Sequence, residues 1–293
     1  MATAAAAITA PSPWVWHPHV EAWALVLALG LAYHAAVRRI GPRYVEKGEA
    51  PASKGQRRLF LLGLATMLVA AEWPVHDLAE RYLYSVHMIQ HMLLTLVVPP
   101  LLLAGTPHWM ARRLLSPKWL MWLTRKVTRP VMALLLFNLI LVLSHWPVIV
   151  NATLRSELLH FLSHSVLFLS GIVMWWPVLS PLPEIPRASY PAQMLYLFLQ
   201  TIVPTVPASF LTFADGPIYT FYEQLPQWFD IAVVEDQRIA GLLMKIGGGL
   251  LLWSVIAVLF FRWSSKEERP EVPDVLEWQQ VERELNEPAG DRG

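Results

Sequence analysis

Seven long apolar segments constrain the fold of this 293-residue chain more than any other feature. An apolar segment of this kind can cross a bilayer only as a helix or as part of a closed barrel, because its backbone polar groups must be satisfied internally. With 55% hydrophobic and only 15% charged residues, the composition fits an integral membrane protein. We therefore predict an all-α, polytopic membrane protein, a seven-transmembrane-helix bundle. Its spans are expected at about 20–40, 57–73, 82–105, 129–150, 157–178, 191–213 and 239–263.

These spans divide the chain into three parts. An N-terminal tail, 1–19, precedes the membrane domain, 20–263, and a charged tail, 264–293, follows it. The charge and the prolines of the final tail predict that it is mostly disordered. Between the third and fourth spans, residues 106–128 mix Trp with basic residues, as is typical of a stretch that lies on the membrane surface.

The distribution of basic residues orients the predicted bundle. The first and third loops are strongly basic, whereas the second and fourth carry one basic residue each and the sixth is acidic. By the positive-inside rule the odd-numbered loops are cytoplasmic, so the N-terminus lies outside and the C-terminal tail is cytoplasmic. The basic residues of the two loops are Arg38, Arg39, Arg43, Lys47, Lys54, Arg57 and Arg58, and then Arg112, Arg113, Lys118, Arg125, Lys126 and Arg129.

Composition also excludes several functions. The chain has no cysteine, so it has neither a disulfide framework nor a thiolate metal site. A formal net charge of +1 gives no reason to expect a nucleic-acid partner, and membrane lipid is the surrounding that the spans require. No catalytic acid–base pair is evident, which favours a protein that is not an enzyme.

Two histidine pairs at helical spacing are the strongest functional signal. His87 and His91 fall in the third predicted span, and His160 and His164 fall in the fifth. Residues four apart share a helix face, and imidazoles in hydrocarbon are costly unless a partner compensates them. At about 1.5 Å per residue, both pairs and His145 of the fourth span lie at similar depths in the outer half of the membrane. This agreement predicts one metal site between the three spans, with His76 and Asp236 near its outer side.

Copper is the favoured ion. Imidazole binds copper, zinc, iron and nickel, and a thioether would favour copper. Met88, Met92 and Met244 lie in the spans that carry the site, although methionine is also ordinary packing in apolar helices. A diiron carboxylate centre needs buried Glu residues that these spans lack. Two alternatives stay open: a single b-type haem, and histidines that only hydrogen-bond between helices.

Two further features have more ordinary interpretations. His17 and His19 stand beside Trp14 and Trp16 in the N-terminal tail, and an interfacial tail explains them better than an entry pair of ligands does. Lys245 in the last span is reminiscent of retinal proteins, but no counter-ion is evident. A lysine this close to the outer surface can extend its amine to the interface, and we expect Lys245 to do so.

Several stretches resemble a known family. The segment YSVHMIQHMLLTLVVPPLLLAGTP (84–107) resembles the signature of the CtaG family of caa-type cytochrome c oxidase assembly factors. The turn at His145-Trp146-Pro147, the stretch HFLSHSVLFLSGIVMWWP (160–177) and Asp236-Gln237 with Ala240-Gly241 and Met244 match in the same order. The likeness covers roughly residues 20–263. The chain departs from the family pattern at Lys245, where a tryptophan is usual.

The resemblance implies a non-enzymatic role in maturing a haem–copper oxidase of the respiratory chain, in a bacterial plasma membrane. It implies copper delivery as a metallochaperone and cytochrome c oxidase subunits as partners. The candidate metal ligands that carry over are His87, His91, His145, His160 and His164, with His76 and Asp236 matching more weakly. A metal or small-solute transporter remains an alternative, which predicts polar groups that continue toward the cytoplasmic half. That half is nearly all apolar apart from His34, Asn138 and Gln200.

Overall fold

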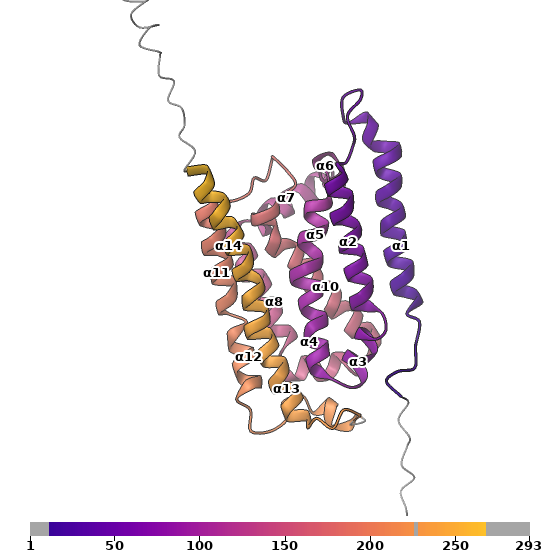
Figure 1. Cartoon of the computed structure of the whole chain (residues 1–293), viewed down its shortest axis with the longest axis vertical. Coiled ribbons are helices and arrows are strands. Elements are labelled where there is room, and N and C mark those ends of the chain that lie inside the picture. The colour runs from indigo at the N-terminus through magenta and orange to yellow at the C-terminus, as the bar shows by residue number, and fades with distance from the viewer. Residues whose placement is uncertain (1–11, 226–227, 268–293) are drawn as a thin grey trace, which may run out of the picture.

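The computed structural model describes residues 12–225 and 228–267, and these residues form helices joined by short loops, without strands (Figure 1). The predicted disorder of the final tail falls largely on residues 268–293, outside the described part. The helices are α1 Val20–Ala35, α2 Lys54–Ala71, α3 Val75–Arg81, α4 Tyr84–Met92, α5 Val98–Gly105, α6 His108–Leu114, α7 Lys118–Val127, α8 Pro130–Ser144, α9 Pro147–Thr153, α10 Glu157–Leu179, α11 Tyr190–Ile202, α12 Thr205–Thr212, α13 Val233–Leu242 and α14 Gly248–Glu267. Three π-helical segments, Ala36–Ile40, Leu93–Val97 and Leu243–Gly247, continue α1, join α4 to α5 and join α13 to α14.

The all-α prediction is confirmed for the described residues, and the number of spans is partly so. Six helices or continuous helix pairs are long and apolar enough to cross a membrane, and the count reaches seven if α7 and α8, which meet at 83°, are taken as one bent span. Many large apolar side chains on these helices are exposed, as lipid-facing residues are, with Leu31 at 68% and Leu250 at 63%. The chain is therefore built as a multi-pass membrane protein.

Two predicted span boundaries are wrong. The fourth span was expected to be continuous over 129–150, but α8 ends at Ser144 and α9 starts at Pro147. Pro147 has no N–H to continue the helix and holds Trp146 in an extended conformation (ψ 129°), so the chain turns at His145. The last span was expected from 239, but its helix begins at Val233, which places Asp236 inside its first turn.

The helices pack as neighbours along the bundle (Figure 1). α2 lies against α5, α10 against α8 and α5, and α11 against α14, while α1 covers α2 at one edge. The short helix α3 and the start of α4 lie at the lower end in Figure 1, which we call the histidine end, and α6 and α7 lie at the opposite end. This arrangement places α10 against the third span, so that the two helices with histidine pairs, α4 and α10, face each other.

Close helix contacts keep α10 against the third span. Pro99 cannot donate to the carbonyl of Thr95, and Trp175 Nε1 of α10 donates to that carbonyl instead at 3.1 Å. Gly171 of α10 faces the same point, where a Cβ would lie 3.0 Å from the Thr95 oxygen. The π-helical segment that joins α4 to α5 is thus held against α10, next to the histidines.

Candidate metal site

The two histidine pairs of α4 and α10 meet in the interior. His91 Nε2 lies 3.0 Å from His164 Nε2, which in turn lies 2.8 Å from His160 Nε2. One nitrogen each from His87, His91 and His164 fall within 4.8 Å of one another. His87, His91 and His160 are buried, each with 7% exposure or less, so the spacing in the sequence correctly places both pairs on facing helix surfaces.

Not every imidazole nitrogen in this cluster can have a good hydrogen-bond partner, and a bound cation would satisfy the nitrogens that remain. A neutral imidazole carries one proton, yet His164 Nε2 faces two nitrogens at once. A single N–H can make only one good hydrogen bond, so at least one contact is poor or brings lone pairs together. His87 Nδ1 and His91 Nδ1 are buried with no hydrogen-bond partner among the described residues. Nitrogens bound to one tetrahedral ion at about 2.0–2.1 Å lie about 3.3 Å apart, close to the observed spacing.

His145 approaches the same cluster from the break between α8 and α9. Its ring centroid is 5.8 Å from that of His91. Its Nδ1 lies 2.7 Å from the Leu141 carbonyl, so Nδ1 carries the proton and donates it there. The Nε2 lone pair is left free, buried and without a partner in the described structure. A backbone carbonyl that fixes the tautomer in this way is usual behind a metal-binding histidine.

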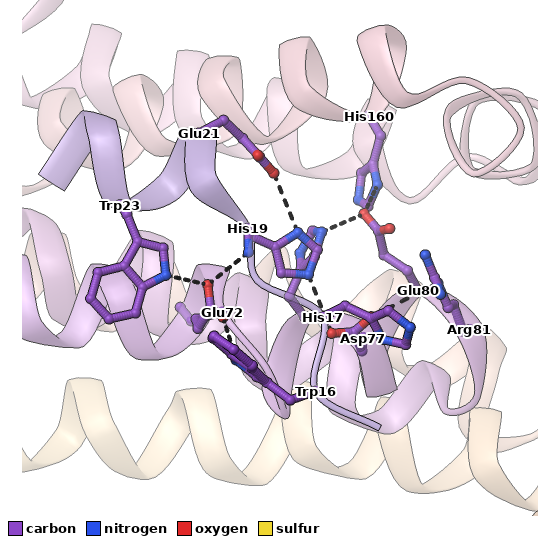
Figure 2. A network of polar contacts seen from close by, with 12 residues as sticks. Trp16, His17, His19, Glu21, Trp23, Glu72, Asp77, Glu80, Arg81 and His160 are labelled. Atoms are coloured by element: carbon purple, nitrogen blue, oxygen red, sulfur yellow. Dashed lines mark hydrogen bonds and ion pairs between the residues drawn. The ribbon is translucent and has the colours of Figure 1, made fainter. Parts of the chain in front are cut away.

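Glu80 is a site residue that sequence reasoning missed. Its Oε1 lies 2.5 Å from His160 Nδ1 and 3.2 Å from His76 Nε2 (Figure 2 shows the first contact). The carboxylate accepts the Nδ1 proton of His160 and leaves Nε2 of that ring to face the cluster. The signal was present in the sequence, because Glu80 stands four residues after His76 on one face of α3.

His76 and Asp236 have other contacts. His76 uses both nitrogens, one toward Glu80 and the other 3.0 Å from Gln90 Nε2. Asp236 accepts hydrogen bonds from the backbone N–H groups of Tyr84, at 2.6 Å, and Ser85, at 3.2 Å. These are the first amides of α4, so Asp236 acts as a helix cap supplied by another helix. We therefore leave both residues out of the inner ligand set.

A pocket opens beside the cluster. His91 and His145 line it together with the thioether residues Met88, Met92 and Met244. Lys245 reaches the same pocket while remaining exposed on the outside of the bundle. His34 and His108 are exposed and take no part in the cluster.

The loop before α13 secures this end of the bundle. Tyr219 OH donates to the carbonyl of His145 at 2.8 Å, and Tyr222 OH donates to that of Ala79 at 2.8 Å. Burial raises the pKa of Tyr219 to about 12, so its hydroxyl stays a hydrogen-bond donor at neutral pH. The loop thereby holds the turn at His145 and the helix that carries Glu80 together through hydrogen bonds.

Fold and site together define a helical, multi-pass membrane protein with a buried imidazole cluster near one end. Comparison with known proteins gives the family. Residues 31–266 match the family of cytochrome c oxidase caa3 assembly factors, so the chain belongs to that family. The match includes both histidine pairs and His145.

Curated relatives are distant. Uncharacterized proteins of Mycobacterium bovis and Mycobacterium tuberculosis are each 24% identical over 275 residues, and one of Mycobacterium leprae is equally similar. Each alignment covers 87% of this chain and 40% of the relative. The chain thus spans less than half the length of these relatives. No solved structure matches it.

Proposed function

We propose that this protein is a membrane assembly factor for a haem–copper oxidase, and that it binds copper at the inner cluster and passes it to an oxidase subunit. The inner cluster comprises His87, His91, His145, His160 and His164. The observation that carries the proposal is the convergence of these imidazoles from three elements, with nitrogens too close to be satisfied by their own protons. Copper in this proposal is cargo, so the role is not enzymatic.

The donor set favours copper over the other ions that imidazole binds. Zinc and iron in helical bundles usually take carboxylate or thiolate ligands, whereas the nitrogens within 4.8 Å of each other are all imidazole. Three thioethers stand in the adjoining pocket, and thioethers favour copper. Neutral ligands also exchange more readily than thiolates, as delivery requires.

The alternatives fit the geometry less well. A transporter needs free polar groups beyond the site, but Asn138 donates to Gln200 at 2.7 Å and Gln200 donates to the Tyr196 hydroxyl at 2.9 Å. These groups satisfy one another instead of lining a path. A bis-histidine haem needs a porphyrin between its two axial nitrogens, and nitrogens 2.8 or 3.0 Å apart leave no room for one.

A deletion strain tests the proposal. We expect oxidase subunits to be made without the protein but to contain little copper, with low oxidase activity under copper-limited growth. Wild type and His34→Ala should restore activity, and a His87→Ala/His91→Ala variant should not. Normal oxidase copper and activity in the deletion strain would refute the role.

Delivery to an oxidase outside the cytoplasm also needs the histidine end to face outward. The proposed orientation has a simple test, because Gly216 lies in the loop at the histidine end, and Gly41 follows the π-helical segment that continues α1 at the other end. A reporter fused after Gly216 should be external and one after Gly41 cytoplasmic. The reverse result would put the site on the wrong side of the membrane for this role.

A further inference from the structure

The N-terminal segment that precedes α1 is held against the corner between α2 and α3. Glu72 Oε2 accepts from Trp23 Nε1 at 2.9 Å and from the backbone N–H of His19 at 3.2 Å, and Glu72 Oε1 accepts from Trp16 Nε1 at 3.1 Å (Figure 2). Glu72 is only 7% exposed. A buried carboxylate that accepts three hydrogen bonds holds the segment firmly against the end of α2. The segment is therefore part of the fold, and its two histidines occupy defined positions.

Those positions bring His17 and His19 to one buried carboxylate. His19 Nε2 lies 3.2 Å from Asp77 Oδ2, and His17 Nδ1 lies 3.6 Å from Asp77 Oδ1 (Figure 2). The Asp77 side chain is 3% exposed, and both Oδ1 and His17 Nδ1 lack a hydrogen-bond partner in the residues described. Arg81 also approaches this carboxylate, with its Nε 3.9 Å from Oδ1, and its side chain is half exposed.

The same residues connect to the inner cluster. The rings of His19 and His76 have centroids 4.4 Å apart, and Glu80 lies between His76 Nε2, at 3.2 Å, and His160 Nδ1, at 2.5 Å. His160 in turn contacts His164 at 2.8 Å. The exposed fraction of the side chain is 41% at His17, 15% at His19, 21% at His76, 27% at Glu80 and 9% at His160. Imidazole and carboxylate groups thus run without a gap from the surface to the interior.

We propose that His17, His19 and Asp77 form a second metal-binding site, the outer site, which takes up a divalent ion such as Cu²⁺ at the surface. Two imidazoles and one carboxylate are a usual donor set for such an ion. His17, with its exposed side chain, closes onto the ion while Asp77 and His19 stay in place. The role of the outer site as the entry to the inner cluster rests on the proposed function, whereas the binding itself does not.

The outer site is tested in a background that lacks the inner one. The full-length protein carrying His87→Ala/His91→Ala is purified in detergent and titrated with CuCl₂, with binding followed by calorimetry and by the electron paramagnetic resonance of Cu²⁺. We expect about one equivalent to bind. Adding His17→Ala/His19→Ala, or Asp77→Asn, should abolish this binding, whereas adding His108→Ala, an exposed histidine at the other end, should not.

Each outcome separates the two proposals. The outer site is overturned if the His87→Ala/His91→Ala protein binds no Cu²⁺, or if its binding survives the outer substitutions. An outer site that binds while the deletion strain has normal oxidase activity refutes only the proposed function. Folding of the outer variants is checked with the inner histidines restored: His17→Ala/His19→Ala should still bind about one equivalent, but load it more slowly than wild type.

Glu72 gives a second measurement that removes no ligand. Glu72→Gln keeps the side-chain shape but weakens the attachment of residues 16–23. In the His87→Ala/His91→Ala protein, Glu72→Gln should weaken Cu²⁺ binding by about tenfold, as loss of a supporting group behind a ligand does. Unchanged affinity would show that the outer site does not depend on this attachment.

Discussion

Asp236 could act as a structural helix cap or as a metal ligand, and its replacement gives opposite results for these two roles. In the structure its oxygens accept from the amides of Tyr84 and Ser85, the first residues of α4, while Leu83 at the N-cap position offers no side-chain cap. His87 stands one turn further along the same helix. Loss of the cap should therefore reduce stability first and metal affinity only indirectly.

The size of the effect follows from the two hydrogen bonds. Asp236→Ala leaves two amides unsatisfied, one of them buried, at about 1–3 kcal/mol each, or about 2–6 kcal/mol together. Asp236→Asn keeps one acceptor oxygen, but its amide nitrogen cannot accept from the second N–H, so one hydrogen bond and the favourable charge at a helix N-terminus are lost, about 2 kcal/mol together. The neighbouring Glu235 is exposed and bonded to Arg238, so Glu235→Ala should change stability by less than about 0.5 kcal/mol.

The assay is unfolding of the purified variants in mixed micelles, paired with copper content at saturation. We expect stability to fall in the order Glu235→Ala, Asp236→Asn, Asp236→Ala, with copper stoichiometry kept in Asp236→Asn. If Asp236→Asn unfolds like wild type but has lost its copper, the carboxylate is a ligand. If Asp236→Ala is as stable as wild type, the cap contributes nothing.

Three other substitutions test the surroundings of the inner cluster. Glu80→Gln should weaken copper binding by about 10–100-fold while leaving the fold intact, because the carboxylate behind His160 loses its charge; equal affinity would contradict this. Gly171→Ala should be about 1–3 kcal/mol less stable than the control Gly249→Ala, since its Cβ meets Thr95 at 3.0 Å whereas nothing lies within 4 Å of the control position. Lys245→Met should leave thermal stability and copper content near wild type, because the exposed amine supports no described ion pair; a marked loss of either would assign it a role in the pocket.

Local spacing predicted which histidines of the inner cluster lie together, whereas their binding of a metal stays a prediction. Residues four apart on a helix share a face whatever surrounds them, so His87 with His91 and His160 with His164 could be paired from the sequence alone. Their common depth, estimated from the helical rise, indicated that the two pairs would meet, and the structure brings them within hydrogen-bonding distance. Hydropathy predicted the helical bundle for the same reason, because it depends only on neighbouring residues.

Long-range contacts were beyond such reasoning. The extent of the fourth span was predicted wrongly because hydropathy does not register that Pro147 breaks a helix, although proline itself was visible in the sequence. The pairing of Glu80 with His160 joins residues on α3 and α10, and no periodicity within either helix reveals it. The attachment of Glu72 to the N-terminal segment likewise joins residues about fifty positions apart.

The two hydrogen-bonding contacts that hold the cluster's helices from outside come from one segment of the chain, which explains why they were not predicted. Tyr219 holds the carbonyl of His145, and Asp236 holds the start of the helix that carries His87, so both contacts come from the chain between α12 and the first turn of α13. They connect residues 74 and 152 positions apart in sequence. The helical repeat therefore sets which histidines face one another, whereas their mutual distances also depend on a segment that contributes no histidine to the inner cluster. Substitutions in that segment should affect stability and affinity together, whereas substitutions at the ligands should remove copper from a bundle that stays folded.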